Sequence, residues 1–199
     1  MIAPERWKRL HPVRDVGASL SDASEGELVR REMMERNEPD TRIRDILRAC
    51  PLFLEVPVRD LDRIAASCQL FRTYRGQTLM EEGDEDNDVF LILSGRATVS
   101  VESISPFIQV SLSRLNPGEV AGEMSLVSDD VRSATVVAET PGDVLQVKGE
   151  ELKAMMKDDP QFGYLMMRNV ASILSRRVRQ MNRRLTNLVK GPYFQTEEG

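Results

Sequence analysis

The sequence predicts a mainly β protein, built as an antiparallel barrel or jelly roll, with helices before the strands and one long helix after them. Two features carry this prediction. Between residues 69 and 148, short apolar runs alternate with clusters of Gly, Pro, Asn and Asp, and many short strands at even spacing are typical of a barrel rather than of alternating strands and helices. Residues 161–190 then follow helical periodicity until Gly191 and Pro192 stop it.

The composition indicates a globular chain with one core and helical extensions. Of its 199 residues, 41% are hydrophobic and 30% are charged, as is usual for such domains. The sequence has no apolar run long enough to cross a bilayer, and its first residues lack the apolar stretch of a signal peptide. We therefore expect a cytoplasmic protein with no membrane contact.

Several kinds of chemistry are excluded by residue counts. His11 is the single histidine, and Cys50 and Cys68 are the two cysteines, so neither a multi-histidine metal centre nor a disulfide framework is expected. Both cysteines stand in apolar helical stretches, which predicts buried free thiols. A net charge of -5 argues against broad attraction to nucleic acid and leaves only a local basic patch.

Helices are predicted on the N-terminal side of the strands. Residues 1–40 form a highly charged arm, in which Ser24 and Glu27 have capping-box spacing before one short helix. Residues 41–68 show helical spacing interrupted by Pro51 and Pro57, which predicts two short helices around a tight elbow. Together with the strands and a short helix before Pro160, they make up a domain of residues 41–159.

The long C-terminal helix, residues 160–190, is followed only by the tail 191–199. Its apolar residues recur in alternating steps of three and four, which is the seam of a coiled coil. Either this stripe folds onto the chain's own barrel or it pairs with a second copy, and its length favours a homodimer through residues 164–188. The stripe consists of Tyr164, Met167, Ala171, Leu174, Val178, Met181, Leu185 and Leu188.

One segment between the strands carries residues suited to an anionic sugar ligand. In GEVAGEMSLVSDDVRSATVV, Arg132 offers a planar fork of donors for phosphate oxygens, and a short helix near Glu123 and Met124 would present free backbone N–H groups. The carboxylate of Glu123 is suited to accept a hydroxyl of a ribose. One helical turn and a loop fit between Glu123 and Arg132, so both side chains can converge on one ligand.

Three blocks of the sequence, in this order, resemble the cyclic-nucleotide-binding domain family: YRGQTLMEEGDEDNDVFLILSGRATV, LNPGEVAGEMSL and RSATVVAE. The resemblance spans residues 45–188. It implies an eight-stranded antiparallel jelly-roll β-barrel that binds cAMP or cGMP, with no other cofactor, no metal and no catalysis of its own.

The resemblance assigns roles to individual residues. Gly122 and Glu123 would bind the ribose 2′-hydroxyl, and Arg132 would pair with the cyclic phosphate. Ser133 would add a hydroxyl or backbone contact at the point where the chain returns through Ala134 to a strand. The short helix of the phosphate-binding segment would consist of Met124, Ser125 and Leu126.

The sequence pattern does not identify the base of the cyclic nucleotide. A hydroxyl residue after the phosphate arginine occurs in similar proteins that bind cAMP and in those that bind cGMP, so Ser133 leaves both open, and cyclic di-GMP also stays open. By register with similar proteins, the long helix would place Arg177, Met181 and Asn182 against the base.

A second hypothesis is a degenerate fold that acts as a ligand-independent interaction or scaffold protein. Ala121 stands where the family usually has a bulkier residue, and Asp129 and Asp130 add negative charge beside the expected phosphate. On this hypothesis Arg132 would pair with one of those aspartates, and Glu123 would cap a helix.

The output is expected to pass through a dimer or an unidentified protein partner. In transcription activators of this family the long helix leads into a helix-turn-helix domain, whereas here only residues 191–199 follow, so no direct DNA binding is expected. A basic run on the long helix is either the solvated flank of a coiled coil or a contact surface for an acidic protein or for nucleic acid. It comprises Arg176, Arg177, Arg179, Arg183 and Arg184.

Overall fold

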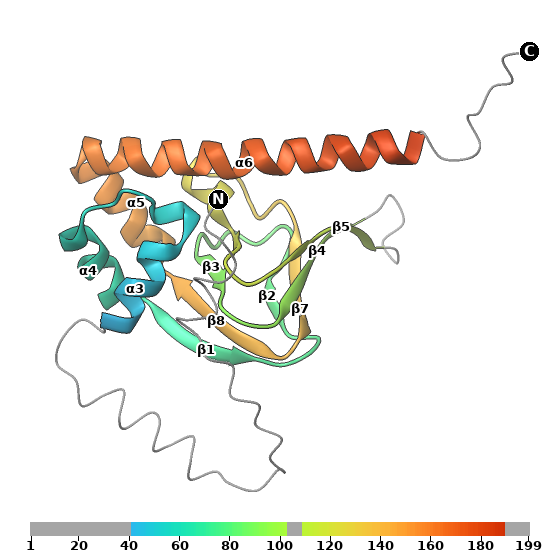
Figure 1. Ribbon diagram of the computed structural model, residues 1–199, viewed down its shortest axis with the longest axis horizontal. Helices are drawn as coiled ribbons and strands as arrows, with labels where there is room; N and C mark the ends of the chain where they lie inside the picture. The colour runs from blue at the N-terminus through green and yellow to red at the C-terminus, as the bar shows by residue number, and fades with distance from the viewer. Residues whose placement is uncertain (1–40, 103–108, 190–199) are drawn as a thin grey trace, which may run out of the picture.

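Two four-stranded antiparallel sheets form the body of the molecule (Figure 1). The structure is a computed structural model that describes residues 41–102 and 109–189. In one sheet the strands lie in the order β1 (Gln69–Thr73), β8 (Gly142–Val147), β3 (Val89–Ile92) and β6 (Val120–Ala121). In the other sheet they lie in the order β2 (Thr78–Met80), β7 (Thr135–Thr140), β4 (Arg96–Glu102) and β5 (Gln109–Leu115). The expected eight-stranded barrel with flanking helices is confirmed.

The barrel is filled by one hydrophobic cluster to which both sheets contribute, with Phe90 and Val144 from the first sheet and Leu115 and Val136 from the second. Strand β3 is buried at all four positions, because one face points into the barrel and the other is covered by helices. This explains its continuous apolar sequence. Strand β6 has only two residues and cannot show periodicity, so no strand pattern marks it in the sequence.

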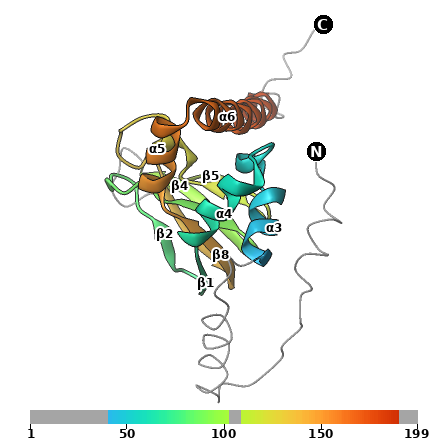
Figure 2. The same ribbon diagram turned by 90° about the vertical axis from the view of Figure 1, so that its left-hand side faces the viewer.

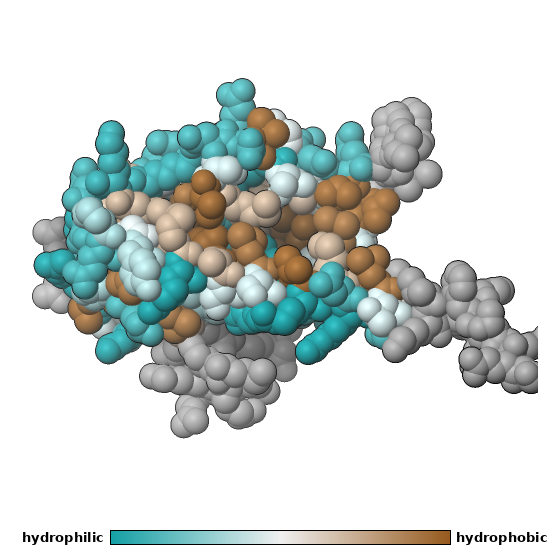
Figure 3. Space-filling view, turned by 90° about the horizontal axis from the view of Figure 1, so that it is seen from above, coloured by the Kyte–Doolittle hydropathy of each residue, from teal (hydrophilic) through white to brown (hydrophobic). Residues whose placement is uncertain are grey.

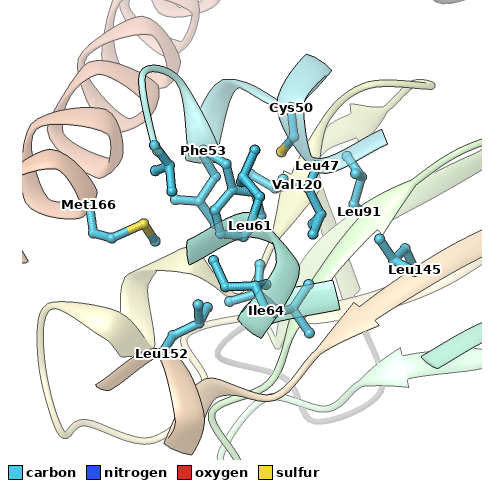
Figure 4. Close-up of a cluster of buried hydrophobic side chains, with 14 of the residues drawn as sticks. Leu47, Cys50, Phe53, Leu61, Ile64, Leu91, Val120, Leu145, Leu152 and Met166 are labelled. Carbon is cyan, nitrogen blue, oxygen red and sulfur yellow. The ribbon is translucent and has the colours of Figure 1, made fainter. Parts of the chain in front are cut away.

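A second hydrophobic cluster lies between the first sheet and the N-terminal helices (Figure 4). Helix α3 (Thr41–Ala49), the 3-10 turn η1 (Pro51–Phe53) and helix α4 (Val58–Ala66) form the predicted elbow. Phe53 and Leu61 are 2% and 1% exposed and pack with Leu91 and Leu145 of the sheet. Burial raises the pKa of Cys50 and of Cys68 to about 12, so both are protonated free thiols at neutral pH.

Helix α5 (Gly149–Asp158) leads into the long helix α6 (Pro160–Val189) across the single residue Asp159. The Asp159 carboxylate accepts the backbone N–H groups of Gln161 and Phe162 at 2.9 and 3.2 Å, and thereby caps the start of α6. Pro160 occupies the first helical position, where its missing N–H costs nothing. Helix α6 lies across the top of the barrel and of the other helices (Figures 1 and 2).

The two halves of α6 differ in their burial. In the first half Phe162, Met166, Val170 and Ile173 are at most 5% exposed and belong to the second cluster. Asn169 is also buried, and its Nδ2 donates to the carbonyl oxygens of Leu52 and Leu54 at 3.0 and 2.9 Å. Beyond Leu174 every position up to Asn187 is exposed except the half-buried Arg177. The first half is therefore part of the core, and the second half rests on the barrel through a few contacts.

The predicted helix after Ser24 and the tail 191–199 lie outside the described residues, as does Lys190. Among the helices that the structure does describe, none has the length and apolarity needed to span a membrane.

Candidate ligand-binding site

A cavity of about 500 Å³ opens between the barrel, the 3-10 turn η2 (Glu123–Leu126) and the second half of α6. Apolar side chains of the strands, such as Val99, Leu115 and Val136, line its interior. Charged groups stand at one end, where Glu123 and Arg132 meet. An apolar cavity with a few converging polar groups is the usual form of a small-molecule site.

Gly122 sets the course of the chain into η2. Its φ of 83° lies in the left-handed region, and a Cβ at this position would stand 2.5 Å from the carbonyl oxygen of Asp88 and 2.7 Å from Nη1 of Arg132. Glycine is required on both grounds. The Ser125 hydroxyl fixes the turn because its Oγ lies 2.7 Å from the Gly122 carbonyl oxygen and 3.1 Å from that of Asn87.

Glu123 is completely buried at the first position of η2. Its Oε1 accepts a hydrogen bond from Nη1 of Arg177, whose Nη2 donates to the carbonyl oxygen of Val120. Its Oε2 has no hydrogen-bond partner among the described residues. Burial raises the pKa of Glu123 above its usual range, although the positive charges of Arg177 and Arg132 oppose this shift.

Arg132 is 3% exposed and is held by several acceptors. Its Nε donates to Oδ2 of Asp86 at 3.1 Å and its Nη2 donates to Oδ1 of the same carboxylate, so the pair is bidentate. Nη2 also donates to the carbonyl oxygen of Asp88 at 2.6 Å. Nη1 makes only long contacts, 3.4 Å to the Gly122 carbonyl oxygen and 3.5 Å to Oγ of Ser125.

Asp86 binds Arg132 from outside the cavity, since Arg132 is a lining residue of the cavity and Asp86 is not. The neighbouring Asp88 carboxylate accepts hydrogen bonds from Lys148 at 2.8 Å and from the backbone N–H of Gly149 at 3.1 Å. The loop of residues 86–88 thus holds the guanidinium on one side and the start of α5 on the other. It leaves Nη1 as the least engaged nitrogen of Arg132.

The other residues expected in the phosphate-binding segment also line the cavity: Met124, Ser125, Ser133 and Ala134. The hydroxyl of Ser133 is exposed and contacts the sulfur of Met124 at 3.5 Å. Met124 is 46% exposed at the mouth, and Ala134 is buried where strand β7 begins. The structure therefore brings all seven residues expected to bind ribose and phosphate to one end of the cavity.

The three positions of α6 expected near the base are not equivalent. Arg177 and Met181 line the cavity, but Asn182 does not. One residue along an α-helix turns the side chain by about 100°, which carries Asn182 away from the barrel that Met181 faces. Arg184, one turn after Gln180, lines the cavity as well and donates to the carbonyl oxygen of Leu112.

The aspartates of the segment do not neutralise Arg132, contrary to the degenerate-site hypothesis. Asp129 pairs with Lys153 at 2.9 Å and its side chain is 97% exposed. Asp130 lines the cavity and is exposed. Nor does the Glu123 side chain cap η2, since the capping position belongs to Gly122.

Sequence reasoning missed Asp86 and Asn169, and it assigned Arg184 to a contact surface rather than to the cavity. Asp86 is one of six acidic residues in the segment Glu81–Asp88, and the sequence pattern does not distinguish it from the other five. Asn169 is the one polar residue of the buried helix face, and a polar residue at a core position is the signal that would have found it.

Chemically the site can hold one anion beside Arg132 and one hydroxyl donor at Oε2 of Glu123. Within residues 41–102 and 109–189 no cluster of His, Cys, Asp or Glu has the arrangement of a metal site.

Comparison with known proteins agrees with this geometry. Residues 71–159 match the family model of the cyclic nucleotide-binding domain, and the matched segment contains strands β2 to β8 together with Glu123 and Arg132 of the cavity. The barrel of this chain belongs to the cyclic nucleotide-binding domain family, which is a family of regulatory sensor domains.

Parts of this chain are similar to proteins of different kinds. The cyclic AMP receptor protein of Thermus thermophilus is 30% identical over 135 residues, 67% of this chain and 60% of the receptor. Glutaminase 2 of Bradyrhizobium diazoefficiens is 34% identical over 122 residues, 60% of this chain but only 19% of that protein. The chain thus spans less than two thirds of either relative. A solved cyclic nucleotide-binding domain from Methylobacillus flagellatus shares the fold, with a TM-score of 0.61, 23% identity, and coverage of 79% of this chain and 85% of that one.

Proposed function

We propose that this chain is a non-catalytic sensor of a cyclic mononucleotide, cAMP or cGMP, that signals through the second half of α6. The nucleotide would lie in the cavity with its phosphate at Arg132, its ribose hydroxyl at Glu123 and its base between the strands and α6. The signal would reach a second copy of the chain or a protein partner, in the cytoplasm.

The observation that carries this proposal is the unpartnered Oε2 of Glu123. A completely buried carboxylate oxygen without a hydrogen bond destabilises a protein, by about 1 to 3 kcal/mol, unless a ligand satisfies it. Here the oxygen stands at a cavity that also presents Arg132. A ligand with an adjacent hydroxyl and anion satisfies both groups, and a ribose 3′,5′-cyclic phosphate is such a ligand.

Helix α6 is suited to transmit binding because its two halves are held differently. The first half is fixed in the core by Phe162 and Asn169. The second half touches the barrel through Arg177 and Arg184, which bind Glu123 and two backbone carbonyl groups around the cavity. A ligand that contacts Glu123 changes the environment of Arg177 directly and so biases the position of this half.

The exposed residues of the apolar stripe of α6 support a homodimer as the unit that responds, and two of them, Val178 and Met181, also line the cavity. Tyr164, Val178, Met181 and Leu185 are between 51% and 67% exposed, and Figure 3 shows a hydrophobic band along the face that carries α6. In the heptad that the stripe defines, Arg177 and Arg184 take one flanking position and Ser175 and Asn182 the other. A parallel pair would therefore set arginine against neutral residues, with no charge repulsion across the seam.

Thermal unfolding with cAMP, cGMP, cyclic di-GMP and AMP tests the proposal. A ligand at a hundred times its dissociation constant stabilises by about 2.7 kcal/mol, which raises the Tm by about 5 to 10 °C at this chain length. We expect such a shift with one cyclic mononucleotide and none with AMP. Arg132→Gln should abolish the shift, whereas the control Arg75→Gln, on an exposed turn outside the cavity, should preserve it.

The alternative is the ligand-independent scaffold. It is favoured if none of the four nucleotides shifts the Tm at millimolar concentration. It also requires that the wild type and Arg132→Gln associate with a second copy of the chain equally well. We expect no turnover of any of these nucleotides by the purified chain, and chromatography of the recovered ligand checks this.

A further inference from the structure

Helix α6 carries a concentration of positive charge that the nucleotide site does not use. Its 30 residues contain six arginines and no acidic residue, while the whole chain has 32 acidic residues, 27 basic ones and a net charge of -5. Arg168 pairs with Glu55 at 2.8 Å and Arg177 pairs with Glu123. The remaining charge lies in the second half of the helix.

Three of these arginines lie on the side of α6 away from the nucleotide cavity, and Arg176 at its edge also borders a small pocket beside Gly118 and Val120. Arg176, Arg179 and Arg183 follow one another at steps of three and four, so they line one side over about 10 Å of the helix axis. All three are exposed, and within the described part of the chain none forms an ion pair. Arg179 donates only to Ser175 of its own helix, at 2.6 Å.

This arginine face is unfavourable for the isolated helix. Like charges three and four residues apart destabilise a helix by about 0.2 to 0.5 kcal/mol for each pair, and no carboxylate on α6 offsets them. The face also lies apart from the apolar stripe, at outer positions of the heptad, so a homodimer through Val178, Met181 and Leu185 would leave it open. A polyanionic partner would remove the repulsion.

The neighbouring residues of this face indicate which polyanion fits. They are polar and without an apolar anchor: Ser172, Thr186 and Asn187. Protein interfaces depend on buried apolar or aromatic anchors, and binding in a membrane interface needs an apolar face beside the charges. Interfaces with nucleic acid are more polar and more positive, and Arg, Lys and small polar side chains such as Ser, Thr and Asn donate hydrogen bonds to phosphate oxygens.

We propose that the arginine face, Arg176, Arg179 and Arg183, binds the phosphate backbone of a nucleic acid. This route does not involve a helix-turn-helix module. The contact is with the backbone, so it selects no base sequence, and the negative charge of the remaining chain restricts binding to low or moderate salt. The proposal is independent of the nucleotide site.

Fluorescence anisotropy with labelled short DNA duplex, single-stranded DNA and RNA tests this proposal, at salt concentrations from about 50 to 200 mM. We expect binding to at least one of the three, with an affinity that falls steeply as salt rises. The triple variant Arg176→Gln, Arg179→Gln, Arg183→Gln should lose this affinity and flatten the salt dependence by about two to three units of the log–log slope. The matched triple variant Arg72→Gln, Arg75→Gln, Arg96→Gln removes as much charge from exposed sites on the barrel and should bind nearly as the wild type does.

Other outcomes would overturn the proposal. Absence of binding to every nucleic acid at low salt removes it, and so does equal loss in both triple variants, which would show a net-charge effect. Binding to poly-glutamate but to no nucleic acid would assign the face to an acidic protein instead. The three arginines touch neither the cavity nor the core, so an unchanged Tm and circular dichroism spectrum of the triple variant should accompany its loss of binding.

Discussion

Arg177 of α6 donates to one oxygen of the buried Glu123 carboxylate, and the other oxygen of that carboxylate has no hydrogen-bond partner in the described structure. The ion pair joins α6 to the turn η2 at the cavity, between residues that are 54 positions apart in the chain. The position of α6 and the environment of the Glu123 carboxylate are therefore linked through this one ion pair.

Arg177→Gln should loosen the second half of α6. The variant leaves the Glu123 carboxylate and the Val120 carbonyl without their charged donor, which we expect to cost about 1 to 3 kcal/mol of unfolding free energy. Hydrogen exchange of residues 174–189 should become faster, while residues 160–173, fixed in the core, stay protected. Arg179→Gln, two positions on and exposed to solvent, is the control and should leave exchange unchanged. Equal exchange in wild type and Arg177→Gln would show that this ion pair does not hold the helix.

Glu123 should make the free protein less stable as pH rises. Because folding raises the pKa of Glu123 above its value of 4.5 in the unfolded chain, its contribution to stability is complete below pH 4.5 and is lost as pH rises through the raised value. Urea unfolding of wild type and Glu123→Gln from acid to neutral pH measures this. The stability of Glu123→Gln relative to wild type should increase with pH over that window. The opposite slope would show that the pairing with Arg177 outweighs burial.

Asp86 should act as a positioning residue for Arg132. The carboxylate holds the guanidinium by two hydrogen bonds from outside the cavity, so Asp86→Asn removes a charged anchor without removing a ligand contact. We expect the dissociation constant for the cyclic nucleotide that stabilises the wild type to rise about tenfold, which corresponds to about 1.4 kcal/mol. Calorimetric titration measures the change. Asp84→Asn removes the same charge from an exposed neighbour and should change affinity little. If Asp86→Asn instead binds more tightly, Asp86 competes with the phosphate.

Gly122→Ala should abolish nucleotide binding and lower stability. The new methyl group would stand 2.5 Å from the Asp88 carbonyl oxygen and 2.7 Å from Nη1 of Arg132, which displaces both the turn and the guanidinium. Gly76→Ala is a matched control, because Gly76 has the same φ of 83° but no atom within 4 Å of the added Cβ. Gly76→Ala should lower the free energy of unfolding by only about 1 to 2 kcal/mol, because alanine is disfavoured in the left-handed backbone conformation. Similar losses of Tm and binding in both variants would contradict the proposed clash.

Leu185→Asp should disrupt the proposed homodimer. Leu185 is 54% exposed on the apolar stripe, and a carboxylate there would be buried without a partner if two stripes pack together. Sedimentation velocity should show a dimer for the wild type and a monomer for Leu185→Asp. Ser172→Asp introduces the same charge on the outer side of α6 and should remain dimeric. A monomeric wild type at micromolar concentration would remove this part of the proposal.

The alternation of short apolar runs with turn residues determined the barrel, and helical spacing determined the elbow helices and α6, because these patterns depend only on the period of each element. The spacing of Glu123 and Arg132, with glycine between β6 and η2, was likewise sufficient to identify the charged end of the cavity. Strand β6 was not predicted, because two residues are too few to show the alternation of a strand.

The tertiary structure alone decided the partners of those residues. Asp86 reaches Arg132 across 46 positions and Arg177 reaches Glu123 across 54, and no local pattern distinguishes Asp86 from Asp84, or Arg177 from Arg176. These pairings depend on how the loop before β3 and helix α6 pack on the barrel. The same packing turned Met181 toward the cavity and Asn182 away from it. The sequence by itself therefore determined the kind of site, whereas long-range packing decided which charges complete it and which oxygen of Glu123 remains free.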